Sequence, residues 1–221
     1  MNGLENIQPP PGLLQNQKNS TAIRIWHWLT FAGFLASMIT VLLGSTFFKT
    51  KDNISPIMVR VAREGGLVTK DQARAIAHDY SDKLWNGHKI IGFVLCFLFV
   101  SRVLIEIYQK KNDTLQNRIR SALNLTPSNE KAIRDRNFYL LVKRGYFLFY
   151  IIFLTMAMTG LVMAFDDIAL LKPLQKTADS IHLFVQWLIY GFIILHIAGV
   201  VYSDLHNNKG IVSGMINGGE H

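Results

Sequence analysis

The stretch IHLFVQWLIYGFIILH, from Ile181 to His196, has a histidine near each end, and Gln186 is the one strongly polar residue between them. An imidazole in so apolar a segment needs a hydrogen-bond partner or a bound group, because burying an unpaired polar side chain costs free energy. His196 is fourteen residues after His182. In a helix, fourteen residues make about four turns, so the two side chains project from the same side, about 21 Å apart along the axis.

This stretch belongs to one of four long, nearly uncharged runs in a chain of 221 residues. Each run has about 20 residues, which is enough for a helix to cross the hydrocarbon core of a membrane. The alternative, a soluble bundle of buried helices, requires polar outer faces that these runs lack. The sequence therefore predicts an all-α integral membrane protein, a four-helix transmembrane bundle. Its expected spans are residues 25–48, 87–108, 145–165 and 181–203.

The expected organisation is a flexible N-terminal tail over residues 1–20, a four-span domain over 21–206 and a C-terminal tail over 207–221. The first span follows a long polar leader and no clear small-x-small cleavage site follows it, so we interpret it as a span and not as a signal peptide. Cys96 is the single cysteine and lies inside the second span. There is therefore no disulfide framework, no cysteine-based metal site and no motif for covalent haem attachment.

The connection over residues 109–144 carries nine Lys or Arg against three acids, whereas seven basic residues of the loop 49–85 are nearly matched by five acids. Basic residues favour the cytoplasmic side of a membrane. The bias predicts that residues 109–144 and both termini face the cytoplasm. The loop 49–85 then lies outside and is called the outer loop below.

The outer loop contains signals for two helices. Ser55 and Pro56 resemble an N-cap followed by a proline at the first helical position, and the glycine pair at 65–66 would end that helix. Thr69 with Gln72 fits a capping box that opens a second helix. Two interpretations stay open for this loop: a solvated hairpin that joins two spans, and a docking platform for an outer partner.

Four of the seven histidines lie in the spans or at their ends: His27, His88, His182 and His196. An ionisable residue in a span is costly and is a functional hypothesis by default. His27 is near the start of the first span and His196 near the end of the fourth, so both lie at one membrane face. His88 opens the second span and His182 opens the fourth, so both lie at the opposite face. The topology thus predicts two pairs, at two depths.

Two histidines from facing helices at one depth can ligate a haem iron between them. Gly92 and Gly199, each about one turn from a histidine, would leave room for a porphyrin. Zinc is a competing metal, but two histidines with no acid at the same depth are few for a zinc site. A proton relay would need carboxylates inside the membrane, and only Glu106 comes close, near a helix end.

Two arginines are further candidates. Arg102 is fourteen residues after His88, so it shares the inward face of that helix but lies at the inner depth. Arg24 is one turn before His27. Either side chain could bind a haem propionate or a quinone headgroup, and the alternative for Arg102 is an arginine that extends from the helix end to the interface.

The ordered set of histidines resembles the bacterial di-haem cytochrome b561 family, which includes the membrane cytochrome b subunits of nickel hydrogenases. The matching residues are His27 in RIWHWLT, His88 in WNGHKIIGFVLCFLFVSRVL, and the pair His182 and His196. The tail HNNKGIVSGMINGG resembles the segment after the last span in the hydrogenase-type branch. The resemblance covers about residues 22–215, and the outer loop departs from it by being longer than in the compact members.

The resemblance implies two non-covalent b haems, the inner one held by His27 and His196 and the outer one by His88 and His182. It implies electron transfer between a redox partner and the quinone pool, as the membrane subunit of a respiratory oxidoreductase in the bacterial inner membrane. The alternative within the family is a stand-alone superoxide:quinone oxidoreductase. A third class, a small transporter or a structural anchor, would be colourless.

The expected partners are membrane lipid, a quinone and a redox partner subunit on the outer or the inner face. Further copies of the chain in an oligomer remain an open alternative. Nothing in the sequence predicts a binding site for nucleic acid, a catalytic nucleophile or a phosphate-binding loop.

Overall fold

The computed structural model describes residues 20–108, 114–124, 126–127, 129–206 and 210–218. Helices make up the regular structure of these residues, which contain no strand. Four of the helices are long and apolar enough to cross a membrane. They are α1 (Thr21–Ser45), α3 (Lys70–Tyr108), α5 (Glu130–Ala164) and α6 (Gln175–His206).

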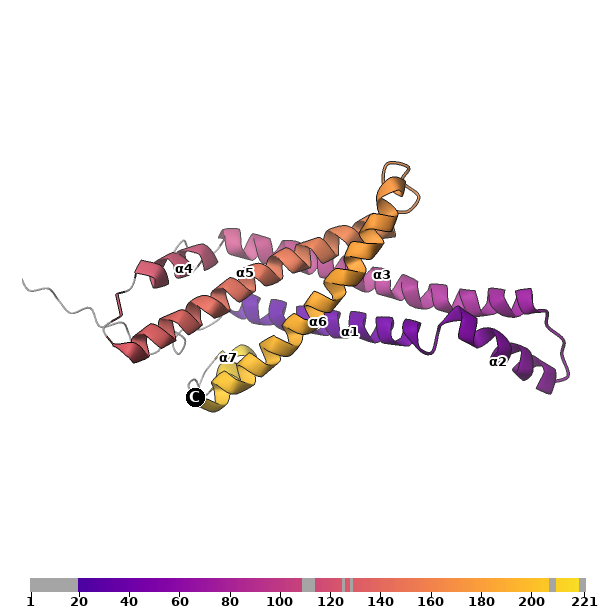
Figure 1. The fold of residues 1–221 in the computed structure, drawn as a ribbon, viewed down its shortest axis with the longest axis horizontal. Helices are drawn as coiled ribbons and strands as arrows, with labels where there is room; N and C mark the ends of the chain where they lie inside the picture. Colours follow the sequence, from indigo (N-terminus) through magenta and orange to yellow (C-terminus); the bar gives the residue numbers. More distant parts are fainter. Residues whose placement is uncertain (1–19, 109–113, 125, 128, 207–209, 219–221) are drawn as a thin grey trace, which may run out of the picture.

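The four long helices form two antiparallel pairs, because α1 packs along α3 and α5 packs along α6 (Figure 1). The α3 helix also contacts α5, and one apolar core joins the two pairs. The buried residues of this core are Phe34, Leu95, Leu98, Phe153, Val185 and Ile189. The start of α1 and the end of α6 lie at the same end of the bundle (Figure 1).

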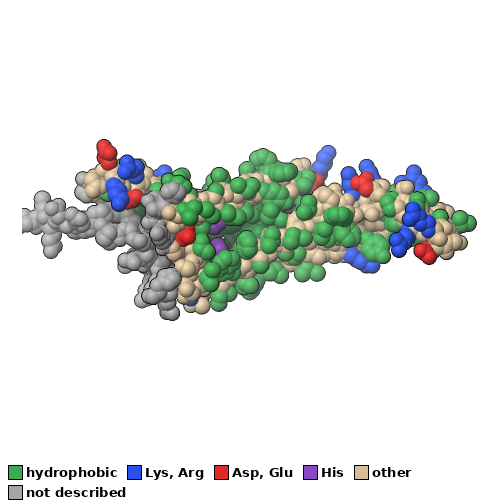
Figure 2. Space-filling view, turned by 90° about the horizontal axis from the view of Figure 1, so that it is seen from below, with side chains coloured by type: hydrophobic (Ala, Val, Ile, Leu, Met, Phe, Trp, Pro, Cys, Tyr) green, Lys and Arg blue, Asp and Glu red, His purple; other side chains and the backbone are tan. Residues whose placement is uncertain are grey.

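The outer surface of the bundle is apolar. Only 11 to 17% of the most apolar window of each long helix is buried inside the chain. Figure 2 shows hydrophobic side chains over the middle of the face in view, with charged side chains towards the two ends. An apolar surface this large is rarely exposed to water in a soluble protein, so it indicates that lipid surrounds the bundle. This arrangement confirms the predicted all-α membrane fold.

Three shorter helices and one 3-10 turn complete the described chain. The α2 helix (Thr50–Arg63) packs against the first part of α3, and the two project past the connection between α5 and α6 (Figure 1). We call α2 and the first part of α3 the outer hairpin. At the opposite end lie α4 (Leu115–Asn124) and α7 (Ile211–Ile216). The 3-10 turn Lys172–Leu174 leads directly into α6.

The outer loop is helical, as expected, but its boundaries differ. The prediction of a helix start at Ser55 and Pro56 is wrong: α2 begins at Thr50 and contains Pro56 in its interior. The predicted end is confirmed, since α2 stops at Arg63 and Gly65 follows with a φ of +78°. At this angle a side chain would be strained, which explains the glycine.

The capping box is confirmed. The Thr69 N–H donates to Gln72 Oε1 at 2.8 Å, and the Gln72 N–H donates to Thr69 Oγ1 at 3.2 Å. The helix it opens does not stop before the membrane, because α3 continues unbroken for 39 residues. The outer hairpin is therefore an extension of a membrane helix, which makes it a rigid projection.

The N-terminal tail predicted over residues 1–20 lies outside the described residues except for Ser20, which caps α1 by accepting from the Ile23 N–H at 3.4 Å. The described part of the predicted C-terminal tail over residues 207–221 contains the short helix α7. This helix contacts α6.

Candidate functional site

The structure brings His27 and His196 together. His27 lies on α1 and His196 on α6, both half-buried, and their ring centres are 6.2 Å apart with 55° between the ring planes. Phe192 stacks on the His196 ring at 5.9 Å, one turn earlier on the same helix. The two imidazoles thus face each other across the bundle from the first and last spans.

This separation fits a metal held between the two rings. Metal–imidazole bonds of about 2 Å, with about 1 Å from each nitrogen to its ring centre, put the centres of two opposed ligands about 6 Å apart. The Nδ1 atom of His27 is also buried and has no hydrogen-bond partner within the described residues. The inner pair is therefore not a hydrogen-bonded pair of core histidines, and its donors suit the iron of a haem.

The outer pair, His88 on α3 and His182 on α6, is also brought together. The two half-buried imidazoles are close enough to interact electrostatically. Each ring is held from a neighbouring helix by a threonine: Thr40 Oγ1 lies 2.7 Å from His88 Nδ1, and Thr159 Oγ1 lies 2.9 Å from His182 Nδ1. Sequence reasoning missed both threonines, although a hydroxyl inside an apolar span was a usable signal.

Glycines leave space around the histidines. A Cβ atom added at Gly160 would lie 3.3 Å from His182 Cε1, so the missing side chain lets the ring sit against α5. A Cβ atom at Gly92 or Gly199 would meet no atom within 4 Å, so both positions border open space. Figure 2 shows histidine side chains at the floor of a hollow in the apolar surface.

A site of the zinc type is not formed by the part of the chain that the structure describes. Within it, no group of three or more His, Cys, Asp or Glu side chains is placed to hold one metal ion. Structural and catalytic zinc sites use three or four protein ligands. The two histidine pairs match the two axial positions of a haem iron better.

Arg102 is held at the inner end of α3 and is mostly buried, with 13% of its side chain exposed. Its Nε donates to the Tyr150 hydroxyl at 2.9 Å, and its Nη2 forms an ion pair with Glu106 at 2.9 Å. Its guanidinium also lies over the ring of Trp26, one residue before His27. An arginine that extends to the interface would be exposed, so that interpretation is wrong.

Arg24 has a different environment, at the start of α1. Its Nη1 donates to the Ile216 carbonyl at 3.1 Å, and its Nη2 donates to Thr21 Oγ1 at 3.2 Å. Trp28 Nε1 donates to the Met215 carbonyl at 3.0 Å. These two side chains hold α7 against α1, close to His27, a contact that nothing in the sequence pattern indicated.

Four apolar spans with histidines paired at two depths define the class of membrane b-type cytochromes. The chain matches the family model of the prokaryotic cytochrome b561 over residues 19–218 and belongs to this family. It is thus a membrane electron-transfer protein of the cytochrome b561 type, and the family typically binds haem b. No curated protein and no solved structure matches it.

Proposed function

We propose that the chain binds two b haems non-covalently and carries electrons between a redox partner and a membrane quinone. His27 and His196 hold the inner haem, and His88 and His182 hold the outer one. When bound, each haem supplies an iron that takes up and releases one electron. The four histidines lie on helices that run through both depths, so the two sites form one path along the bundle.

The observation that carries this proposal is the inner pair, whose ring centres are 6.2 Å apart. That distance leaves room for one metal ion and its bonds to the two imidazole nitrogens. The apolar residues around the pairs exclude water, and their low polarity tunes the redox potential of any bound haem. The histidines bind and orient the haems.

Substitution of single histidines tests the pairing. We expect His88→Ala and His182→Ala each to remove one haem and keep the other, because a haem that loses one axial ligand is no longer held. His27→Ala and His196→Ala should remove the opposite one. The measurement is the haem-to-protein ratio of the purified variants, together with their absorption spectra. Loss of the same haem in His27→Ala and His88→Ala contradicts the pairing.

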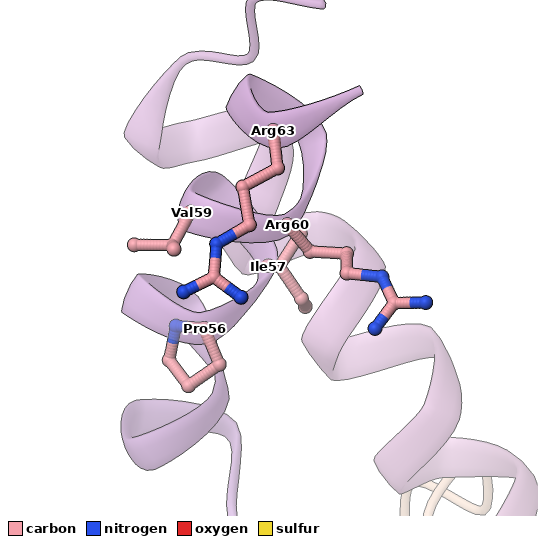
Figure 3. A pocket seen from close by; sticks show the side chains of 5 residues that line it. All are labelled: Pro56, Ile57, Val59, Arg60 and Arg63. Carbon is pink, nitrogen blue, oxygen red and sulfur yellow. The ribbon is translucent and has the colours of Figure 1, made fainter. Parts of the chain in front are cut away.

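The electron partner docks on the outer hairpin in this proposal. Its acids are largely neutralised within the chain, by pairs such as Asp79 with Lys83 at 2.8 Å, which also raises the pKa of the Lys83 ammonium group. By contrast, Arg60 and Arg63 have no ion pair within the described residues. They line a hollow on the exposed side of α2 together with Pro56 (Figure 3). An acidic surface would complement this side.

Reversal of the charges of Arg60 and Arg63 tests this docking. We expect Arg60→Glu with Arg63→Glu to abolish co-purification of a partner subunit in mild detergent, because like charges then face each other. The matched control is Lys51→Glu with Arg74→Glu, which changes net charge equally on the same hairpin. Equal loss in both double variants, or loss in neither, contradicts a specific role of Arg60 and Arg63.

A quinone binds at the inner end in this proposal. Arg102 and Arg24 each keep one buried guanidinium nitrogen, Nη1 and Nε respectively, with no hydrogen-bond partner among the described residues. Such donors suit the carbonyl oxygen of a quinone. Of the two, Arg102 is the better placed, because its guanidinium lies over the ring of Trp26, the residue before the inner ligand His27.

Charge-conserving substitutions test the quinone site. We expect Arg102→Lys to raise the KM for a quinone analogue about tenfold and to keep both haems, because lysine lacks the forked donors of arginine. Arg24→Lys is the comparison. It should raise the KM less, because the Arg24 guanidinium already donates a hydrogen bond to the Ile216 carbonyl of α7. The measurement is steady-state quinone reduction with both variants. Unchanged KM in Arg102→Lys contradicts the assignment.

We also propose that the protein lies in the bacterial inner membrane with both termini and residues 109–144 in the cytoplasm. The basic bias of residues 109–144 supports this orientation. The outer hairpin then faces the periplasm.

Thiol labelling tests the orientation. In a Cys96→Ala background, we expect a membrane-impermeant maleimide to label Leu67→Cys, at an exposed position of the outer loop, in whole cells and to label Arg120→Cys only after the cells are opened. The reason is that the reagent reaches only the periplasmic side of the inner membrane. The reverse pattern contradicts the proposed orientation.

A further inference from the structure

The two outer histidines share a contact that the inner ones do not make with any described residue. The Nδ1 atom of each outer ring meets a threonine hydroxyl on a neighbouring long helix: Thr40 on α1 reaches His88 on α3, and Thr159 on α5 reaches His182 on α6. The Oγ1–Nδ1 distances of 2.7 and 2.9 Å are those of good hydrogen bonds. Two separate helix pairs thus provide the same contact at the same depth.

The direction of the first hydrogen bond follows from the other contact of Thr40. Its Oγ1 lies 2.6 Å from the Ser37 carbonyl, which only accepts, so the hydroxyl proton is donated there. A hydroxyl has a single proton. The Thr40 oxygen is therefore left as the acceptor, and His88 Nδ1 carries the proton that it accepts.

The same reasoning applies to Thr159, which is buried. Its Oγ1 lies 2.8 Å from the Thr155 carbonyl and 3.1 Å from the Met156 carbonyl, so its proton is donated to the preceding turn of α5. The oxygen then accepts from the protonated Nδ1 of His182. Both threonines are thus oriented by their own backbone and present a lone pair to an imidazole.

The consequence concerns the other ring nitrogen. A neutral imidazole carries one proton, so protonation at Nδ1 leaves the lone pair of Nε2 free to bind a metal. A hydrogen bond from Nδ1–H also fixes the orientation of the ring and raises its basicity as a ligand. At the inner depth, in contrast, His27 Nδ1 is buried and has no such partner within the described chain.

We propose that Thr40 and Thr159 are positioning residues that hold His88 and His182 as Nδ1–H tautomers and make them stronger electron donors to the outer haem. This inference rests on the proposed function. A stronger donor stabilises the oxidised, more positive iron, so the two threonines lower the potential of the outer haem. The chain thereby sets different potentials at two sites that have the same ligands.

The test is a redox titration of the purified, haem-loaded chain, followed by absorption. We expect Thr40→Val and Thr159→Val each to raise the potential of the outer haem, by up to about 60 mV, a tenfold change in the equilibrium constant of a one-electron couple. The component that is missing in His88→Ala identifies the outer haem. The inner potential should stay unchanged, and Thr40→Ser and Thr159→Ser should restore the outer one.

Thr155→Val is the matched control. The Thr155 hydroxyl donates to the Ile151 carbonyl of its own helix at 2.9 Å and belongs to the same helix as Thr159. Its removal should leave both potentials unchanged, and its backbone carbonyl remains available to Thr159. A valine variant could instead lose the outer haem. In that case, a serine variant at the same position that keeps the haem supports the inference, and a serine variant that also loses the haem contradicts it.

Other outcomes separate this inference from the proposed function. Valine variants with both haems and unchanged potentials overturn the inference alone. An equal shift of both potentials, or a shift of the same size in Thr155→Val, also overturns it, because the effect is then one of general packing. A wild-type protein without haem overturns the proposed function, and the inference with it.

Discussion

The cost of placing imidazoles among hydrocarbon is the constraint on which the rest of the structure depends. Each of the four histidines lies in a helix whose outer surface is apolar, and water is not there to hydrate a ring nitrogen. The chain meets this cost by bringing the rings together in pairs, with α6 contributing to both. The fold can therefore be understood as four helices arranged around two points where polar groups must be satisfied.

The surroundings of the two pairs differ. At the outer depth, threonine hydroxyls satisfy Nδ1 of both rings and leave Nε2 free. At the inner depth, the surroundings are charged: Arg102 and Glu106 form a mostly buried ion pair beside Trp26. The inner end is also covered by α7, which Arg24 and Trp28 hold against α1. One ligand set thus sits in two electrostatic environments, which suits a chain that passes electrons in steps.

Much of this was predictable from the sequence, for physical reasons. The length and apolar composition of the spans predict the four helices. Successive spans cross the membrane in opposite directions, so the position of a histidine within its span predicts its depth. The Thr69–Gln72 capping box was predictable because its bonds are local. The predicted start of α2 was wrong, because Pro56 was assigned to the first helical position although it lies inside the helix.

The remaining features depend on how the helices are rotated against one another. Thr40 is 48 residues from His88, and Trp28 is 187 residues from Met215, so no local pattern relates them. The burial of Arg102 depends likewise on Tyr150, 48 residues away on another helix. Such contacts become visible only when the helices are packed in three dimensions.

The number of haems bound by the wild-type chain tests the central claim most directly. Purified protein with its full complement should yield two non-covalent b haems per chain when haem and protein are each quantified, and the redox titration should resolve two components. One haem per chain, or none, would contradict the account, because one of the two histidine pairs would then have no metal to hold.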